Sequence, residues 1–457
     1  LPVDKKSGDR AVAGTINGRG SFVLRTTGAG ADTLLARIIR MVQQAQGSKA
    51  PVQRIADRIA SVFVPTVIGL SALTFVLWLV IGGEAYFSHA LLSAVSVLVI
   101  ACPCALGLAT PTALMVGIGR GAENQILIKD AAALEQMCRI DTMVLDKTGT
   151  LTEGRPSVTE WIDVVPPSDG LYDAVYSAEM KSEHPLASAV TAYLAGRGAR
   201  RREVDSFESL TGRGIAFRCD GASYWIGSRA LLETRDVRPS VELLARIDRL
   251  EQEGAGTVFV GQDDRLLSVV VVSDPLKETT REALEQLRRR HIRLVMLTGD
   301  NRRAAAALAG RLGIDDFRAE MMPDDKEQYV RRLQAEGRRV AMTGDGINDS
   351  QALARADVSI AMGRGTDVAM DVAMITLMNS DLSLLPKAYA LSRSTVRLIR
   401  ENLFWAFVYN LIGIPIAAGA LYPLCGLLLS PMLAGAAMAF SSVSVVANSL
   451  RLKWKKL

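Results

Sequence analysis

The residues with the clearest capacity for chemistry are acidic side chains that follow apolar runs. Asp146 opens the segment Asp-Lys-Thr-Gly-Thr directly after the apolar residues 142–145. An aspartate carboxylate can attack a phosphorus atom and form an aspartyl phosphate. Because that attack brings negative charges together, it needs a cation and fixed hydrogen-bond donors beside the nucleophile.

Later segments supply side chains of these kinds, again after apolar runs. Thr298, in Thr-Gly-Asp, can hydrogen-bond phosphoryl oxygens, and Lys326, after Pro323, can neutralise them. Asp345 and Asp349, in Thr-Gly-Asp-Gly-Ile-Asn-Asp, offer the hard oxygen ligands that suit Mg²⁺. One such turn could occur by chance, but four in this order indicate a phosphoryl-transfer site.

A second group of residues indicates a soft metal ion. Cys102, Pro103 and Cys104 lie inside a long apolar stretch. Thiolates favour Cu(I) and similar ions over Mg²⁺ or Ca²⁺. Pro103 removes a backbone hydrogen bond to the Val99 carbonyl, so we expect the helix to break there. A broken helix inside a membrane is tolerated where it lines a site.

The last two apolar stretches narrow the choice of ion. They carry Tyr409, Asn410, Met438 and Ser441, and they contain no Asp, Glu, Lys or His. Zinc would be better served by a carboxylate near the thiolates, whereas a thioether suits a monovalent soft ion. A methionine at such a position is more often a packing residue, so the whole set, rather than Met438 alone, indicates the ion.

Four stretches lack Asp, Glu, Lys and Arg and are long enough to cross a membrane, which takes about 20 residues. They are residues 59–83, 89–119, 402–422 and 425–450. Basic residues flank them on the side of the 120–401 block, which the positive-inside rule places in the cytoplasm. Those residues are Arg54, Arg58, Arg120, Lys129, Arg393, Arg397, Arg400, Arg451, Lys453, Lys455 and Lys456.

The 120–401 block alternates strand-like apolar runs with helical patterns. Residues 141–146, 292–300 and 338–349 each end in an Asp-bearing turn, which is typical of a parallel α/β sheet with its chemistry at the carboxyl ends of the strands. Residues 157–272 interrupt this pattern and predict a separate small α+β domain. Before the first span, the pattern predicts short strands with glycine turns, followed by an amphipathic helix.

Composition excludes some classes of protein. A net charge of +5 on 457 residues gives no case for nucleic-acid binding, which needs a concentrated basic face. Five cysteines in a chain of this length do not form a disulfide scaffold.

The four phosphoryl-transfer elements resemble the phosphorylation domain of P-type ATPases, which has a haloacid-dehalogenase-like fold. The resemblance implies that Asp146 is the nucleophile and that Lys147 belongs to the catalytic loop. It implies Mg²⁺ held by Asp146, the Thr148 carbonyl and Asp345. By the same resemblance, Thr298 and Lys326 hold the phosphate, and Asn348 and Asp349 support the site.

The inserted domain resembles the nucleotide-binding domain of the heavy-metal branch. Ser182-Glu-His-Pro-Leu186 matches its signature, which implies that Glu179, His184, Gly212 and Gly214 bind ATP. One departure is Ser228, where that branch commonly has Asn in a Gly-Asn-Arg turn.

Cys-Pro-Cys followed by Tyr-Asn and Met-x-x-Ser-Ser resembles the copper(I) subclass of these pumps. The resemblance implies Cu⁺ ligation by Cys102, Cys104, Tyr409, Asn410, Met438 and Ser441. Asp57 matches the position of a carboxylate through which the ion enters, although it could equally be a solvated helix end. The zinc and cadmium subclass normally places a Lys and an Asp in the last two spans, and both are missing here.

We therefore expect a multi-domain membrane protein. It would combine an α-helical transmembrane bundle, with four spans in this chain, and a cytoplasmic haloacid-dehalogenase-like α/β phosphorylation domain with an inserted α+β nucleotide-binding domain. The expected segments are an actuator-domain remnant (1–30), a linker helix (31–58), two spans with Cys-Pro-Cys (59–119), the phosphorylation domain and stalk (120–156 and 273–401), the nucleotide-binding domain (157–272), two spans (402–450) and a basic cytoplasmic tail (451–457).

The expected function is ATP-driven export of Cu⁺ or Ag⁺ through an aspartyl phosphate, with ATP and Mg²⁺ as cofactors. The implied surroundings are a bacterial plasma membrane, with a lipid bilayer and a cytosolic copper chaperone as partners and no nucleic acid. The alternatives are a zinc or cadmium pump, and an inactive or phosphatase-like remnant.

The family's full chain has further N-terminal parts: soft-metal-binding domains, four more spans and an actuator domain with a Thr-Gly-Glu loop. No Thr-Gly-Glu occurs here. We therefore expect this chain to be the C-terminal portion of such a protein, whether a natural truncation, a fragment or an incomplete gene product. The chain alone is not expected to turn over, because the Glu of that loop positions the hydrolytic water in the family.

Overall fold

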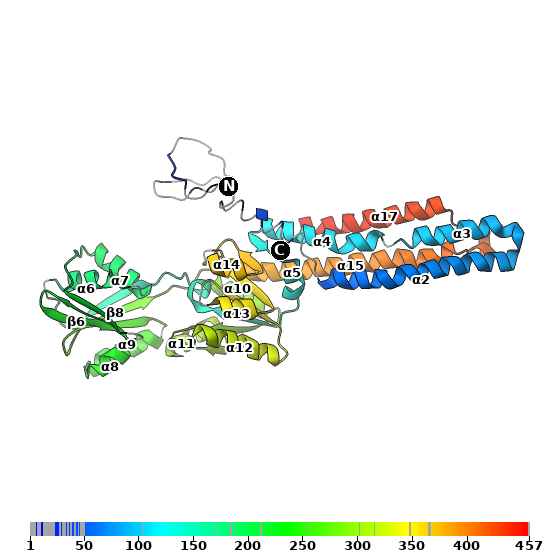
Figure 1. Ribbon diagram of the computed structural model, residues 1–457. Coiled ribbons are helices and arrows are strands. Elements are labelled where there is room, and N and C mark those ends of the chain that lie inside the picture. Colours follow the sequence, from blue (N-terminus) through cyan, green and yellow to red (C-terminus); the bar gives the residue numbers. More distant parts are fainter. Residues whose placement is uncertain are drawn as a thin grey trace. The chain divides into compact units, whose positions relative to one another are not determined.

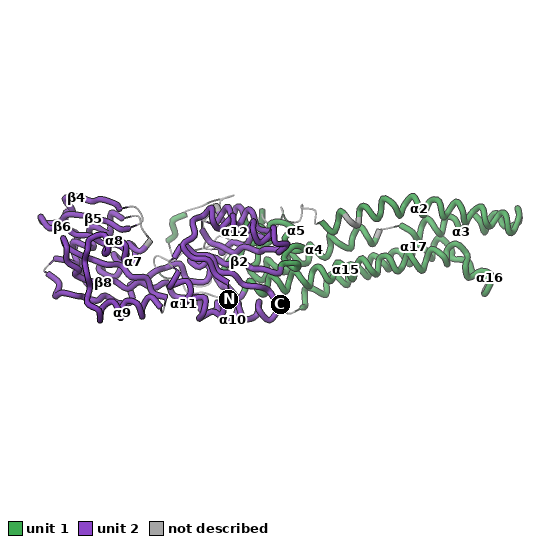
Figure 2. Tube along the Cα trace, turned by 90° about the horizontal axis from the view of Figure 1, so that it is seen from below, with its two compact units in different colours: residues 1–140, 373–379, 384–457 green, residues 141–372, 380–383 purple. Residues whose placement is uncertain are grey.

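The structure, a computed structural model, divides into two compact units that are described separately (Figure 2). The first unit comprises residues 1–140, 373–379 and 384–457, and the second comprises residues 141–372 and 380–383. The predictions for 1–30 and for most of 31–50 lie outside the described residues. The structure describes residues 51–102, 104–168, 170–182, 185–210, 213–252, 254–300, 302–314, 316–346, 349–363 and 367–455, with isolated positions between 6 and 45.

The first unit is built from long helices that lie side by side in both views (Figures 1 and 2). Shorter elements complete it: η2 (Glu84–Tyr86), β1 (Ile126–Ile128), α5 (Ala131–Met137), β13 (Ile375–Leu377), α16 (Tyr422–Cys425) and η5 (Arg451–Trp454). β1 and β13 pair as antiparallel strands. The long helices are α2 (Pro51–Gly82), α3 (Phe87–Ile100), α4 (Cys104–Glu123), α15 (Leu384–Ala417) and α17 (Pro431–Leu450).

Three helical stretches of the described chain are long and apolar enough to cross a membrane: Pro51–Gly82, Glu84–Glu123 and Pro431–Trp454. These helices expose large apolar side chains, such as Ile68, Leu73 and Val80 on α2. A face of this kind is expected to meet lipid, because soluble monomers rarely expose so large an apolar patch.

The limits of the last two predicted spans need correction. The stretch predicted at 402–422 is the apolar end of α15, which stops at Ala417 before a turn that contains Gly419 at φ +101°. The stretch predicted to begin at residue 425 becomes helical only at Pro431. Proline suits the first position of a helix, and the Ser430 hydroxyl accepts a hydrogen bond from the Leu433 amide at 3.3 Å, which caps α17.

The segment 120–156, predicted as phosphorylation domain and stalk, is divided between the two units after residue 140. Residues 120–140 lie with the helices, since α5 packs against α15. The Ser392 hydroxyl of α15 donates a hydrogen bond to the Leu134 carbonyl of α5. The remaining domain limits stay predictions.

The second unit contains a parallel sheet of the kind predicted. Its strands in this unit run in the order β12-β11-β2-β9-β10, and all neighbours are parallel. The three Asp-bearing turns therefore follow the carboxyl ends of adjacent central strands, as predicted. The strands are β2 (Thr142–Asp146), β9 (Arg293–Leu297), β10 (Asp316–Arg318), β11 (Val340–Gly344) and β12 (Val358–Met362), joined by α10 (Thr280–Arg288), α11 (Arg302–Leu312), α12 (Pro323–Ala335), α13 (Ser350–Arg355) and α14 (Asp367–Val372).

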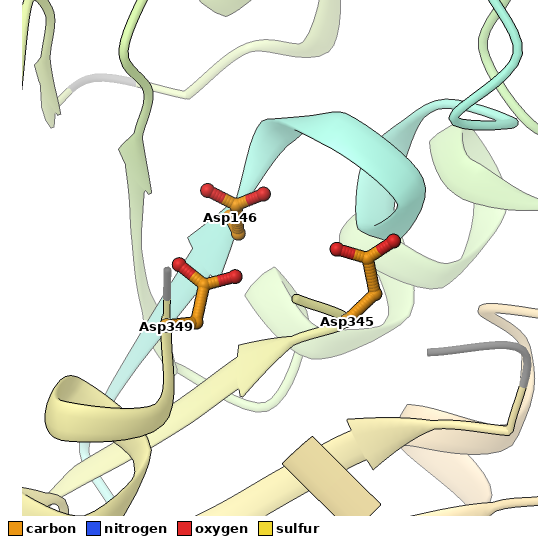
Figure 3. Close-up of side chains that lie close together, drawn as sticks. All are labelled: Asp146, Asp345 and Asp349. Carbon is orange, nitrogen blue, oxygen red and sulfur yellow. The ribbon is translucent and has the colours of Figure 1, made fainter. Parts of the chain in front are cut away.

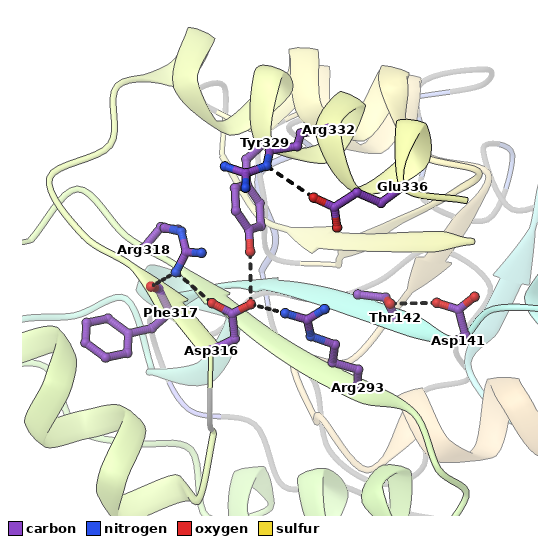
Figure 4. A network of polar contacts seen from close by, with 9 residues as sticks. All are labelled: Asp141, Thr142, Arg293, Asp316, Phe317, Arg318, Tyr329, Arg332 and Glu336. Atoms are coloured by element: carbon purple, nitrogen blue, oxygen red, sulfur yellow. Dashed lines mark hydrogen bonds and ion pairs between the residues drawn. The ribbon is translucent and has the colours of Figure 1, made fainter. Parts of the chain in front are cut away.

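A polar network fixes α12 against this sheet (Figure 4). Asp316, on the edge strand β10, accepts a hydrogen bond from the Tyr329 hydroxyl of α12 at 3.1 Å. The same carboxylate pairs with Arg293 of β9 and, at 2.7 Å, with Arg318. Because α12 also carries Lys326, this network helps to position that lysine.

Residues between β2 and α10 form a six-stranded antiparallel sheet in the order β3-β8-β7-β6-β5-β4. Helices α6 and α7 pack on one face through Val175, Val190 and Leu194, and helices α8 and α9 pack on the other. The elements are β3 (Ser157–Asp163), α6 (Leu171–Glu179), α7 (Pro185–Gly196), β4 (Ser206–Leu210), β5 (Gly214–Cys219), β6 (Ala222–Gly227), α8 (Arg229–Thr234), α9 (Val241–Gln252), β7 (Gly256–Gln262) and β8 (Arg265–Ser273).

Candidate active site and metal site

Asp146 is the last residue of β2, and its side chain is 5% exposed. The chain then turns through Lys147–Leu151, where Gly149 adopts φ +71°. A Cβ at Gly149 would lie only 1.5 Å from Asp345 Oδ2. Glycine is therefore required twice at this position, by the backbone conformation and by the close approach of the Asp345 carboxylate.

Three carboxylates converge at this point (Figure 3). Asp146, Asp345 and Asp349 each offer an oxygen, and these oxygens lie within 4.8 Å of one another. Lys326 Nζ donates hydrogen bonds to Asp146 Oδ1 at 2.5 Å and to Asp349 Oδ1 at 2.7 Å. The structure thus brings together four predicted residues that come from three separate motifs.

The cluster is short of positive charge. Burial raises the pKa of Asp146 to about 7, and Asp349 adds to the rise while Lys326 opposes it. Burial and then Asp349 raise the pKa of Asp345 to about 6. Burial alone would lower the pKa of Lys326, but Asp146 and Asp349 outweigh it and raise that pKa. Lys326 bonds to two of the three carboxylates, and Lys277 lowers the pKa of the third, Asp345, only in part. Two lysines for three buried carboxylates leave a deficit that a divalent cation would relieve.

The donor set fits Mg²⁺, which prefers oxygen ligands from one or two carboxylates together with substrate phosphate. Asp146 and Asp345 are placed to hold the ion. Thr148 is an exposed residue inside the turn Lys147–Leu151, and its carbonyl is the third expected ligand. Bound there, the ion would neutralise the charge that develops on the transferred phosphoryl group.

The remaining predicted residues of this site are placed as follows. Thr298 directly follows β9 and is 2% exposed, and its hydroxyl accepts a hydrogen bond from the Asp300 amide at 3.1 Å. Lys147 forms an ion pair with the Asp300 carboxylate. Asn348 lies outside the described residues.

Sequence reasoning missed a second layer of contacts beneath the catalytic turn. Thr152 Oγ1 donates a hydrogen bond to Asp274 Oδ2 at 2.5 Å, and the other Asp274 oxygen accepts from the Arg155 amide at 3.1 Å. The buried Lys277 donates from Nζ to the Gly149 carbonyl. Asp274 directly follows β8, and Lys277 lies shortly after it, where the chain returns to the parallel sheet. Charged residues at this return point were the signal in the sequence that could have identified them.

We expect Lys277→Met to slow phosphorylation of Asp146 about 10- to 100-fold, since hydrogen bonds from charged groups contribute about 1.5–3 kcal/mol. The loss of the Nζ donor leaves the Gly149 carbonyl and the adjoining turn less constrained. ATP affinity should stay close to that of the parent, because the substitution lies outside the inserted domain. Rapid-quench labelling of the full-length protein measures the rate, and an unchanged rate would show that Lys277 does not position the turn.

The inserted domain carries the predicted nucleotide residues. Glu179 ends α6 and is 7% exposed, and burial raises its pKa to about 7. Gly214 opens β5 at φ +147°, where a Cβ would lie 2.1 Å from the Ile226 carbonyl oxygen. His184 and Gly212 lie outside the described residues. The Ser228 hydroxyl is buried, and among the described atoms it has no hydrogen-bond partner.

We expect ATP affinity to rise as pH increases through about 7. Glu179 is protonated below its raised pKa and ionised above it, and the ionised form accepts the stronger hydrogen bond from an adenine amino group. A difference of about 1 kcal/mol corresponds to roughly five-fold in affinity between pH 6 and pH 8.

Glu179→Gln is the matched control, because it keeps the shape of the side chain and does not titrate. The difference between the pH profiles of parent and variant, measured by calorimetry on the full chain, removes the titration of ATP itself. Parallel profiles would show that Glu179 does not govern nucleotide affinity. In the absence of ATP, protonation of Glu179 favours the folded state, because its pKa is higher there than in the unfolded chain. The free energy of unfolding therefore falls as pH rises from about 4.5 to about 7.

The predicted helix break is present in the first unit. α3 ends at Ile100 and α4 begins at Cys104. Cys102 lies half-buried in the break and is disulfide-bonded in this structure. The side chain of Cys104 lies outside the described residues. Only the reduced thiols can supply thiolate ligands to a metal ion.

Side chains from α15 and α17 reach the region of the break. Met438 is 6% exposed and belongs to one apolar cluster with Ile100 and Ala101. Gly413 faces Ile100 so closely that a Cβ there would lie 2.5 Å from its Cδ1. Asn410, one turn before Gly413, is also buried.

Two polar atoms in this region, Asn410 Oδ1 and Ser441 Oγ, are buried without a hydrogen-bond partner among the described atoms. Such atoms are expected where an ion or water completes the site. Tyr409 is 37% exposed, and Asp57 is an exposed residue of α2. Neither is placed with the buried set, and their roles stay predictions.

Comparison with known protein families gives the same fold for the part of the chain that contains the carboxylate cluster. The family model of haloacid dehalogenase-like hydrolases matches residues 140–357. Fold and site thus define a haloacid-dehalogenase-like domain, with an inserted antiparallel domain, in a multi-pass membrane protein.

The chain belongs to the heavy-metal branch of the P-type ATPases. It is similar to a zinc-transporting PIB-type ATPase solved in its E2.Pi state, with a TM-score of 0.72, 32% identity, and coverage of 93% of this chain and 68% of that one. It is 48% identical to a copper-exporting P-type ATPase of Legionella pneumophila over 99% of this chain and 61% of the relative. It is 47% identical to a silver exporting P-type ATPase of Salmonella typhimurium over 100% of this chain and 56% of the relative. The chain thus spans less than two thirds of the length of these curated relatives.

Proposed function

We propose that the protein represented by this chain exports monovalent copper or silver ions, driven by ATP through an aspartyl phosphate on Asp146. The observation that carries the choice of ion is the chemistry near the helix break. The buried Met438, Asn410 and Ser441 are soft or neutral, and the sequence of the last two spans contains no carboxylate, lysine or histidine. A divalent ion would lack charge compensation there, whereas a monovalent soft ion needs none beyond the thiolates.

The phosphoryl-transfer step follows from the carboxylate cluster. An Asp146 oxygen attacks the γ-phosphorus of ATP, the bond from that phosphorus to the bridging oxygen breaks, and ADP leaves with the electron pair. Lys326 Nζ, now bonded to Asp146 Oδ1, can transfer its hydrogen bond to a phosphoryl oxygen, and Thr298 can donate from its hydroxyl. Asp349 holds Lys326 on its other side and keeps it in place during the transfer.

ATP would bind in the inserted domain, with Glu179 at the adenine and the bare backbone of Gly214 against the nucleotide. Glu179 supports the proposal as a buried carboxylate. Gly214 is required by its φ of +147° and by the Ile226 carbonyl, which occupies the place of a Cβ, so its part in nucleotide binding rests on the family resemblance. The proposed cofactors are therefore ATP, bound in the inserted domain, and Mg²⁺, held at the carboxylate cluster.

The ion would enter near Asp57, at the basic end of α2, and pass to Cys102 and Cys104. Thiolate and thioether ligands bind Cu⁺ strongly, so we expect the ion to be passed directly from one such ligand to the next. We therefore include a cytosolic copper-carrying protein as the donor.

ATP-driven accumulation of Cu⁺ in inverted membrane vesicles tests the proposal. Vesicles with the full-length protein under reducing conditions should accumulate Cu⁺ and Ag⁺ but not Zn²⁺. Zn²⁺ uptake faster than Cu⁺ uptake would contradict the choice of ion.

A further inference from the structure

One face of α3 carries a line of polar side chains that leads away from the helix break. His89, Ser93 and Ser96 recur at intervals of four and three residues, which places them on one face of the helix. Ser93 is 1% exposed and Ser96 is fully buried, so this face is turned into the bundle. His89 precedes Cys102 by 13 residues, or about 20 Å of helix.

Aromatic rings surround His89 at the far end of this line. Its ring centroid lies 5.8 Å from that of Trp78 on α2, 5.1 Å from that of Tyr86 and 5.6 Å from that of Tyr422 on α16. Trp78 and Tyr422 also contact each other, at 5.0 Å. Trp78 is held in place by a hydrogen bond of 3.0 Å from Nε1 to the Ala418 carbonyl. We call these four residues the aromatic box.

Two polar atoms in this region are buried without a partner among the described atoms, namely His89 Nδ1 and Ser93 Oγ. A serine or threonine in a helix usually bonds back to a carbonyl of the preceding turn. Thr74 on α2 does so at 2.8 Å, whereas Ser93 does not. An unsatisfied polar group inside a membrane protein costs several kcal/mol, so its presence calls for an occupant.

The box lies at the end of the bundle away from the cytoplasmic basic residues. Trp78 follows Arg58 by 20 residues on α2, or about 30 Å, which matches the hydrocarbon thickness of a bilayer. Tryptophan and tyrosine also gather at such depths as an interfacial belt. The aromatic residues of an interfacial belt direct their polar atoms to water. Here the rings of Trp78, Tyr86 and Tyr422 lie around His89, whose Nδ1 is buried.

We propose that His89 is a transient ligand for the transported monovalent soft ion as it leaves the bundle on the non-cytoplasmic side. This inference rests on the proposed function. The imidazole supplies one nitrogen ligand, whose lone pair lies in the plane of the ring. Trp78 stacks on this ring at an interplanar angle of 29° and Tyr422 meets it at 73°, so the two aromatic rings hold the imidazole in one orientation. The box contains no thiol or carboxylate, so it holds the ion more weakly than Cys102 and Cys104. Weak binding is what a site of release requires. The ion only exchanges ligands, and no covalent or redox step is involved.

The test compares four variants of the full-length protein in vesicles: His89→Ala, His89→Gln, His89→Met and Ser88→Ala. Glutamine keeps a polar side chain of similar size but is a poor soft ligand, whereas methionine is a good one. Ser88 is an exposed neighbour on α3 and is the matched control. Each variant is assayed for Cu⁺-dependent phosphorylation and for ATP-driven Cu⁺ accumulation.

All four variants should be phosphorylated like the parent, since the ion still reaches the thiolates. Accumulation should fall about ten-fold in His89→Ala and His89→Gln, and stay within about two-fold of the parent in His89→Met and Ser88→Ala. Full accumulation by His89→Gln, equal loss in His89→Met, or loss of phosphorylation in His89→Gln would each overturn the proposal. A parent that neither accumulates Cu⁺ nor responds to it would instead contradict the proposed function.

Discussion

Replacement of Asp146 by Asn is expected to abolish the covalent phosphoenzyme, with a loss of about 10³-fold or more. Asparagine has the same shape but no nucleophilic carboxylate. It also removes one of three crowded negative charges, so the fold should tolerate it. In the full-length protein, radiolabelled ATP should leave an acid-stable, hydroxylamine-sensitive label in the parent and none in the variant.

The matched control for this experiment is Asp141→Asn. Asp141 lies just before the opposite end of β2, where it accepts hydrogen bonds from Thr142 at 2.6 Å and from the Arg339 amide at 3.1 Å. It contributes to the strand without touching the carboxylate cluster, so this variant should keep the label. Label that persists in Asp146→Asn would sink the assignment of the nucleophile.

The second large effect is expected at the helix break. The double substitution Cys102→Ser and Cys104→Ser keeps the size of both side chains but replaces soft ligands with hard ones. Under reducing conditions, Cu⁺-stimulated ATP hydrolysis should fall about 100-fold or more, because two ligands are lost together. ATP binding should be unchanged, since the nucleotide residues lie in the other unit.

Cys219→Ser serves as the control, because Cys219 is buried in the inserted domain, where its Sγ donates a hydrogen bond to the Glu203 carbonyl at 3.3 Å. It should retain full stimulation. A double variant that still responds to Cu⁺ would show that the thiols are not ligands on the transport path.

The carboxylate cluster could be predicted from sequence because its members follow the carboxyl ends of parallel strands, which meet at one edge of a sheet. Asp146 and Lys326 are 180 residues apart, yet each carries a recognisable local motif. The helix break was predictable too, because proline lacks the amide proton that a continuous helix needs.

Other features depend on contacts that no local pattern specifies. Lys277 bonds to a carbonyl 128 residues away, and only the packed fold shows that its side chain is buried. Tyr409 and Asn410 are adjacent in sequence, but α15 exposes the first and buries the second. A turn at Gly419 follows the end of α15, and a cap at Ser430 marks the start of α17. Both lie inside a uniformly apolar stretch, so the hydrophobicity of the sequence does not show where the helices end or begin.

The most direct test of the account is the metal dependence of phosphorylation at Asp146. Full-length parent protein is incubated under reducing conditions with labelled ATP and Mg²⁺, with Cu⁺, Ag⁺, Zn²⁺ or no added metal, and quenched in acid. The account predicts that Cu⁺ and Ag⁺ increase a hydroxylamine-sensitive label and that Zn²⁺ leaves it at the level without metal. A label that increases with Zn²⁺ and not with Cu⁺, or one that resists hydroxylamine, would contradict it.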